Sequence, residues 1–129
     1  MYTVKVINER KKIAMLKWEG MVKESEVKEA TRELDAVYKQ FGSQKFYLMV
    51  DVKDMKVFSP DAKVAIGEQQ KWIRSKIHKV GGVMDKKLIE RQLEEVSKES
   101  KVDELEVPFP SYEKALEFLD DLASNKSEV

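Results

Sequence analysis

Apolar residues recur with two different periods along the chain, and each change of period marks the boundary of an element. Short apolar runs predict strands at Tyr2–Val6, Ile13–Trp18, Lys45–Val52, Val80–Met84 and Glu104–Phe109. Apolar residues three and four positions apart predict helices at Val22–Phe41, from Ser59 to Lys76, at Lys86–Lys98 and after Ser111. This order predicts an α/β domain with an N-terminal β-hairpin and a mostly parallel sheet of about five strands with about four helices.

The expected helices have recognisable ends and buried sides. Gly42 follows the first helix as a C-terminal cap, and the residues of its inward stripe are Val27, Ala30, Leu34, Val37, Tyr38 and Phe41. Ser59 is expected to be the N-cap of the second helix, Pro60 its first residue, and Asp61 a favourable charge at its start. Its expected buried residues are Val64, Ala65, Trp72 and Ile73. Ser111 is expected to cap the last helix, whose inward residues are Ala115, Leu116, Leu119 and Leu122.

Composition narrows the class of protein without naming a reaction. The 129 residues suit one domain, which we place at residues 1–123, followed by a flexible polar tail at residues 124–129. Lys plus Arg and Asp plus Glu are both 24, so the net charge of zero argues against nucleic acid as a partner. The sequence contains no cysteine and shows no signal peptide or membrane-spanning segment, so we expect a cytoplasmic protein without thiol chemistry.

The stretch VDVKDMKVFSPDAKVAI, residues 50–66, resembles the strand, loop and helix of STAS domains. Those domains carry a pattern close to V-D-L-x-x-V-x-F-I-D-S-S-G-L, and the matching residues here are Val50, Asp51, Val52, Met55, Val57 and Phe58. Asp61 stands where the family has its phosphorylated serine, and Ala62 replaces the glycine that follows. The resemblance therefore does not extend to control by phosphorylation.

Three other segments resemble the SpoIIAA-like branch of small bacterial and archaeal proteins within this STAS-type group. They are IAMLKWEGMVKESEV, HKVGGVMDKKLIERQL and VPFPSYEKALEFLDDL, in the order in which that branch has them. The resemblance implies a single SpoIIAA-like domain. It also implies a binding role, because relatives bind protein partners, nucleotides or apolar ligands, and it supplies no catalytic residues.

Two candidate sites follow from these observations. The loop after the third strand, with Phe58, Ser59, Pro60 and Asp61, is the expected contact for a protein partner or small ligand, in a non-enzymatic module that we expect to be a homodimer. The alternative is a carrier of an apolar, lipid-like molecule. Its pocket would be lined by Trp18, Met21, Met55 and Trp72, residue types that suit adaptable apolar surfaces and equally suit an ordinary core.

Other residues with chemical potential have simpler structural interpretations. The carboxylates of Asp51, Asp54, Asp61 and Asp85 could gather around a cation, but aspartate is also common in turns and at helix starts. His78, the only histidine, is expected in a loop after the second helix. Gly81-Gly82 lacks a dinucleotide fingerprint and indicates close packing instead. We therefore expect no catalytic residues, cofactor or metal.

Overall fold

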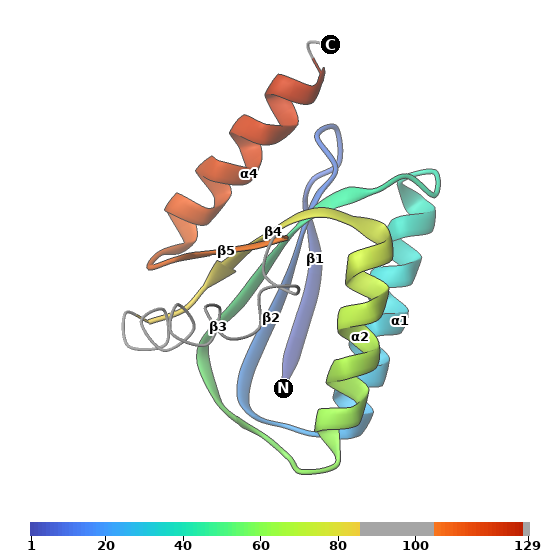
Figure 1. The fold of residues 1–129 in the computed structure, drawn as a ribbon, viewed down its shortest axis with the longest axis vertical. Coiled ribbons are helices and arrows are strands. Elements are labelled where there is room, and N and C mark those ends of the chain that lie inside the picture. Colours follow the sequence, from blue (N-terminus) through green and yellow to red (C-terminus); the bar gives the residue numbers. More distant parts are fainter. Residues whose placement is uncertain (86–104, 128–129) are drawn as a thin grey trace.

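A computed structural model describes residues 1–85 and 105–127 of the chain (Figure 1). The elements are β1 (Tyr2–Asn8), β2 (Ile13–Val22), α1 (Glu24–Gln40), β3 (Phe46–Phe58), α2 (Ala62–Lys76), β4 (Ile77–Val83), β5 (Glu106–Phe109) and α4 (Tyr112–Ser127). The α/β class is confirmed. The described residues hold three helices rather than four, and the predicted helix Lys86–Lys98 lies outside them.

The strands form one sheet in the order β1-β2-β3-β4-β5. β1 pairs antiparallel with β2, with Val4 opposite Leu16, which confirms the N-terminal hairpin. The pairs β2–β3, β3–β4 and β4–β5 are all parallel. The sheet is therefore mixed, and the hairpin is antiparallel because only antiparallel neighbours can be joined by a short turn.

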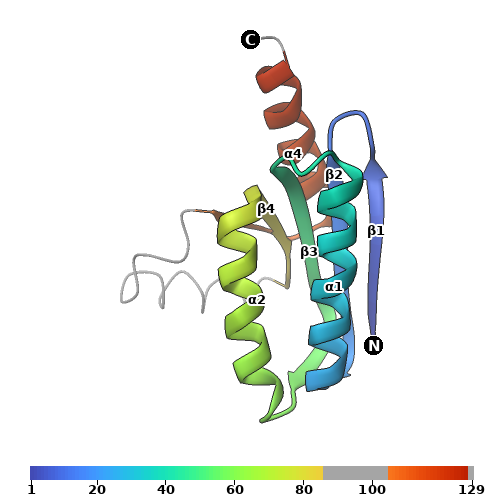
Figure 2. The same cartoon turned by 90° about the vertical axis from the view of Figure 1, so that its right-hand side faces the viewer.

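Helices α1 and α2 stand side by side on one face of the sheet (Figure 2). They lie on the same face because each right-handed crossover adds the next parallel strand in the same direction. The largest fully buried side chains between these helices and the sheet include Trp18, Leu34, Phe46, Leu48 and Ile77. The predicted stripe of α1 is confirmed, with Tyr38 only partly buried. Gly42 ends the helix in a left-handed conformation, with φ 74°, as a C-terminal cap requires.

Helix α4 covers part of the opposite face. Its buried residues Ala115 and Leu119 pack on a cluster from the strands that consists of Ile13, Met15, Tyr47, Met49 and Val83. The predicted cap is confirmed, because the Ser111 hydroxyl accepts a hydrogen bond from the Lys114 N–H (3.3 Å). The helix continues to Ser127, beyond the point where the sequence predicted a tail.

Three details differ from the predictions. β3 does not end at Val52 but continues to Phe58, because its second half still pairs with β2. Val64 is 71% exposed rather than buried, because α2 begins at Ala62 and its buried stripe consists of Ala62, Ala65 and Gln69. His78 lies on β4 rather than in a loop, since β4 follows α2 directly.

Candidate functional site

The C-terminal ends of β2 and β3 lie next to each other, and each leads into a helix (Figure 1). Val22, the last residue of β2, pairs with Phe58, the last residue of β3. The loop Ser59–Asp61 then connects β3 to α2. In α/β sheets, ligands usually bind at this edge, because the loops and helix N-termini that follow the parallel strands meet there.

The loop Ser59–Asp61 is closed by hydrogen bonds of its own. The Ser59 N–H donates to the Val22 carbonyl (2.8 Å), and the Ala62 N–H donates to the Ser59 carbonyl (3.0 Å). The Ser59 hydroxyl donates to the Asp61 carboxylate. No side chain caps α2, whose N-cap position is Asp61, so the predicted cap at Ser59 is wrong, and Pro60 lies in the preceding turn. The hydroxyl of Ser59 is thus bonded within its own loop. Pro60 and Asp61 are exposed.

Phe58 is oriented differently from the rest of the predicted contact loop. It ends β3 and is partly buried against the core below α1 and α2. Its ring lies edge-on to that of Trp18, with 5.9 Å between the centroids. The structure therefore places Phe58 with the interior and only Ser59, Pro60 and Asp61 in the loop.

Two exposed apolar side chains, those of Met21 and Val57, lie next to each other at this same edge. Among the described residues, the large hydrophobic side chains classed as exposed are Met1 (71%), Met21 (53%), Val57 (53%) and Val64 (71%). Met21 and Val57 are opposite each other in the β2–β3 register, and Val64 lies in the first turn of α2. The Met1 carbonyl accepts a hydrogen bond from the Glu19 N–H of β2 (2.8 Å). Met21, Val57 and the loop Ser59–Asp61 make up what we call the docking edge.

A hollow at the docking edge lies between the starts of α1 and α2. Its charged residues are Lys23, Lys28, Glu24 and Asp61, so positive and negative groups are balanced. Lys28 and Glu24 form an ion pair with 2.8 Å between Nζ and Oε1. Met21 lines this hollow rather than the interior pocket predicted for it.

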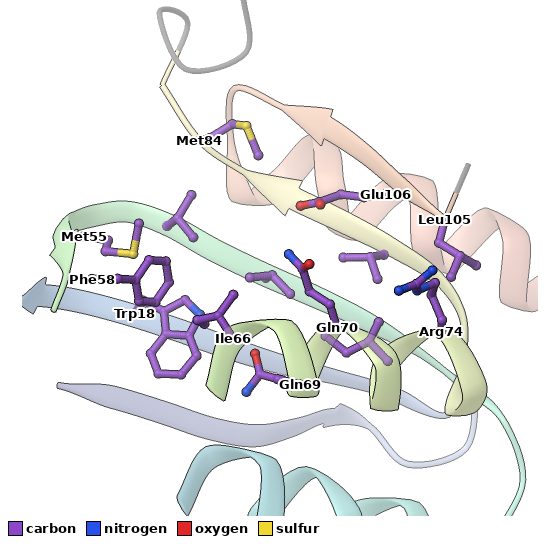
Figure 3. A pocket seen from close by; sticks show the side chains of 14 residues that line it. Trp18, Met55, Phe58, Ile66, Gln69, Gln70, Arg74, Met84, Leu105 and Glu106 are labelled. Atoms are coloured by element: carbon purple, nitrogen blue, oxygen red, sulfur yellow. The ribbon is translucent and has the colours of Figure 1, made fainter. Parts of the chain in front are cut away.

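A more enclosed cavity of about 220 Å³ lies between the sheet and α2 (Figure 3). Its apolar lining consists of Trp18, Val50, Val52, Met55, Phe58, Ile66, Ile73, Val80, Met84 and Leu105. The structure thus brings together Trp18 and Met55, two of the four residues proposed for an apolar pocket. The cavity is smaller than the roughly 300 Å³ at which sites for drug-sized ligands begin, so it suits a small or slender apolar group.

Trp72 lies outside this cavity and joins α1 to α2. Its ring lies edge-on to those of Tyr38 and Phe46, at 6.4 Å from each. Its indole N–H donates to Asp35 Oδ1 (3.3 Å), and Asp35 also pairs with Lys39. The hydrogen bond from Lys39, and then that from Trp72, hold the pKa of Asp35 below its usual value.

The polar groups of the cavity were not predicted from the sequence. They are Gln69, Gln70, Arg74 and Glu106. Gln69 is only 3% exposed, and its side-chain amide donates to the Thr31 hydroxyl (3.0 Å). A Cβ on Gly82 would lie 2.7 Å from Glu106 Oε1, so the missing side chain leaves room for that carboxylate. The one sequence feature that could have indicated these polar groups is Gln69, a polar residue within the apolar stripe of α2.

The predicted aspartates do not form a cation site. Asp51 accepts a hydrogen bond from the Lys53 N–H (3.0 Å), and Asp54 pairs with Lys17 (3.2 Å), which raises the pKa of that lysine. Across residues 1–85 and 105–127, no group of three or more His, Cys, Asp or Glu side chains is placed to hold a metal ion. Within the same residues, no helix combines the length and apolar character needed to cross a membrane.

No protein-family model matches the sequence, and no curated protein is significantly similar to it. Among solved structures, the fold is similar to that of an uncharacterised DUF3478-family protein with a SpoIIAA-like fold from Shewanella loihica PV-4, with a TM-score of 0.74, 12% identity, and coverage of 92% of this chain and 93% of that chain. It is also similar to the unphosphorylated form of the anti-sigma factor antagonist SpoIIAA (TM-score 0.62, 6% identity, 95% and 97% coverage). The phosphorylated form of SpoIIAA, a Bacillus cell fate determinant, gives a TM-score of 0.59 at 7% identity, with 91% and 97% coverage. The fold that the resemblance predicted is confirmed: this chain has a SpoIIAA-like, STAS-type fold.

Proposed function

We propose that the protein is a non-enzymatic, cytoplasmic binding module that engages a protein partner through the docking edge. The observation that carries this proposal is the adjacent pair of exposed apolar side chains, Met21 and Val57, on the strand ends beside the loop Ser59–Asp61. Exposed apolar side chains with polar groups around them are typical of interaction sites. The anti-sigma factor antagonist SpoIIAA shares the fold, which agrees with a role in protein interaction.

The docking edge has the layout of a small protein interface. Met21 and Val57 would form its apolar centre, and the charges of Lys23 and Asp61 would lie at its rim. The loop is already fixed by its hydrogen bonds to β2 and to α2, so little conformational entropy would be lost on binding. We also propose that the protein forms a homodimer, either through the docking edge or through another surface that leaves the docking edge free for a different protein.

Capture of partners from the source cell, compared between matched variants, tests this proposal. Asp61→Lys places a positive charge in the docking edge, and Asp121→Lys makes the same change on an exposed position of α4. A partner recovered with the wild type should be recovered equally with Asp121→Lys and about tenfold less with Asp61→Lys, as expected for disruption of an interface residue. If Asp61→Lys and Met21→Ser both leave every interaction unchanged, the docking edge is not the binding surface.

The second candidate function, a carrier of a small apolar molecule, is favoured by the cavity between the sheet and α2. Native mass spectrometry of protein purified without denaturation should then show extra mass that is lost on unfolding. In Trp72→Phe, Trp18 remains as the only tryptophan and lies in the cavity wall. Because Trp18 is already only 1% exposed, its emission intensity should report loading more clearly than its wavelength. A protein with no extra mass, and no Trp18 response to added fatty acid, would contradict the carrier function.

A further inference from the structure

The end of the sheet opposite the docking edge carries a hollow of about 510 Å³ with strongly positive lining. The hairpin between β1 and β2 contributes Arg10, Lys11 and Lys12, and Lys45 comes from the segment before β3. Among the described residues, no carboxylate lines this hollow, although the whole chain has 24 acidic and 24 basic residues. Its charge is thus unlike that of the balanced hollow at the docking edge.

The fold holds the hairpin in place against β3. The Asn8 side chain accepts a hydrogen bond from the Lys11 N–H (3.0 Å), and the Lys12 carbonyl accepts one from the Tyr47 N–H (2.9 Å). Lys12 adopts a left-handed conformation with φ 57°, which is uncommon for a residue with a side chain. The lysine is therefore fixed in the turn by the surrounding bonds rather than by its own preference.

Most of the positive charge of the hollow is not paired with a carboxylate in the part of the chain that the structure describes. Lys11 pairs with Asp120, with 2.7 Å between Nζ and Oδ1. Lys12 donates instead to the neutral amide of Gln44. Within residues 1–85 and 105–127, Arg10 and Lys45 form no ion pair. Three cationic side chains thus line one hollow without a carboxylate partner among the described residues.

Two rings form the floor of the hollow. The rings of Tyr47 and His78 lie 5.4 Å apart between centroids, with an angle of 36° between their planes. Tyr47 is 7% exposed, and burial raises the pKa of its phenol. The hollow therefore combines cationic side chains with an aromatic base.

We propose that this hollow binds a phosphate-bearing anion, with Arg10, Lys12 and Lys45 surrounding the phosphate above the Tyr47–His78 floor. Three positive charges match a group that carries two or more negative charges, whereas a single carboxylate would leave most of them unpaired. Arginine and lysine are the usual partners of phosphate, the first through its planar fork and the second as a point charge. The site is separate from the docking edge and does not depend on the proposed function.

Titration with pyrophosphate, at constant pH and ionic strength, tests the site. His78 is the only histidine, so its imidazole resonances report directly on the hollow. We expect a saturable shift of these resonances, with about tenfold weaker binding in Arg10→Ala/Lys45→Ala. Lys53→Ala/Lys56→Ala removes the same amount of positive charge from exposed positions of β3 and should bind as the wild type does.

A parallel assay with phosphatidic acid vesicles, whose phosphomonoester headgroup can carry two negative charges, distinguishes a soluble phosphate from a lipid headgroup. Sedimentation with vesicles that depends on Arg10 and Lys45, without saturable pyrophosphate binding, would assign the phosphate to a lipid. Saturable pyrophosphate binding with the same dependence would assign it to a soluble molecule. The proposal is overturned if neither probe binds, or if the Arg10→Ala/Lys45→Ala variant binds both probes as the wild type does.

Discussion

Replacing Leu119 by alanine tests how α4 is held on the sheet. Leu119 is 0% exposed, and its Cδ1 lies 3.4 Å from the position that a Cβ on Gly81 would take. The substitution removes three buried carbons, a loss of about 2.4 kcal/mol at about 0.8 kcal/mol for each. Because the cavity left behind adds to this, we expect the free energy of unfolding to fall by about 2.7–5.0 kcal/mol.

The matched control is Leu116→Ala, which makes the same change on the same helix at a half-buried position. Leu116→Ala should lower the free energy of unfolding by about 1 kcal/mol. Urea unfolding followed by circular dichroism and by tryptophan fluorescence gives both values. Trp18 and Trp72 lie on the face covered by α1 and α2, so coincident transitions would show that α4 unfolds together with that face. If Leu119→Ala destabilises no more than Leu116→Ala, Leu119 does not anchor α4 and the reasoning is refuted.

The adjacent glycines of β4 and a tyrosine of β1 give further tests. Gly81→Ala should stabilise by about 0.4–1 kcal/mol in urea unfolding, because its Cβ would make ordinary contacts at 3.4–3.5 Å and the unfolded chain would lose freedom. Gly82→Ala should raise the free energy of unfolding by less, because its Cβ would lie 2.7 Å from Glu106 Oε1 and must displace that carboxylate. Equal changes in the free energy of unfolding for the two variants would contradict this. A hydrogen bond with Glu33 raises the pKa of Tyr2 from 10.0 to about 12, so its contribution to stability is complete below pH 10 and declines as the pH rises toward 12. In an ultraviolet titration of the tyrosines, the ionisation step of Tyr2 at high pH should be lost in Tyr2→Phe and should move to lower pH in Glu33→Gln.

The sequence predicted the elements well where burial is uniform and less well where it changes along one element. The stripe of α1 repeats regularly because the helix packs on the sheet along its whole length. β3 is different, because its pairing with β4 ends at Asp51 while its pairing with β2 continues to Phe58. Among the described strands, its second half has a neighbour on one side only, and it tolerates exposed charges such as Lys53 and Lys56. A charged turn and a strand of this kind have the same polar pattern, so periodicity could not separate them.

The candidate sites were predicted only in part for a related reason. Residue type suggested a pocket for two tryptophans, but only the packing decides that Trp18 faces the cavity and that Trp72 joins the two helices. The positive hollow has no local motif, because Arg10, Lys45 and His78 are far apart in the sequence and meet through strand register. The predicted cap at Ser59 failed because α2 begins only at Ala62, so that Asp61 rather than Ser59 occupies the N-cap position.

The length of β3 has a consequence for how the molecule would work with two ligands at once. The strand has 13 residues, with Tyr47 near its start in the positive hollow and Val57 near its end at the docking edge. At about 3.3 Å per residue, these two positions are separated by about 33 Å. Ligands at the two ends would not compete for space, and a continuous strand would keep them at a fixed separation. The domain would then act as a rigid spacer that binds an anion at one end and a protein at the other, without contact between the two ligands.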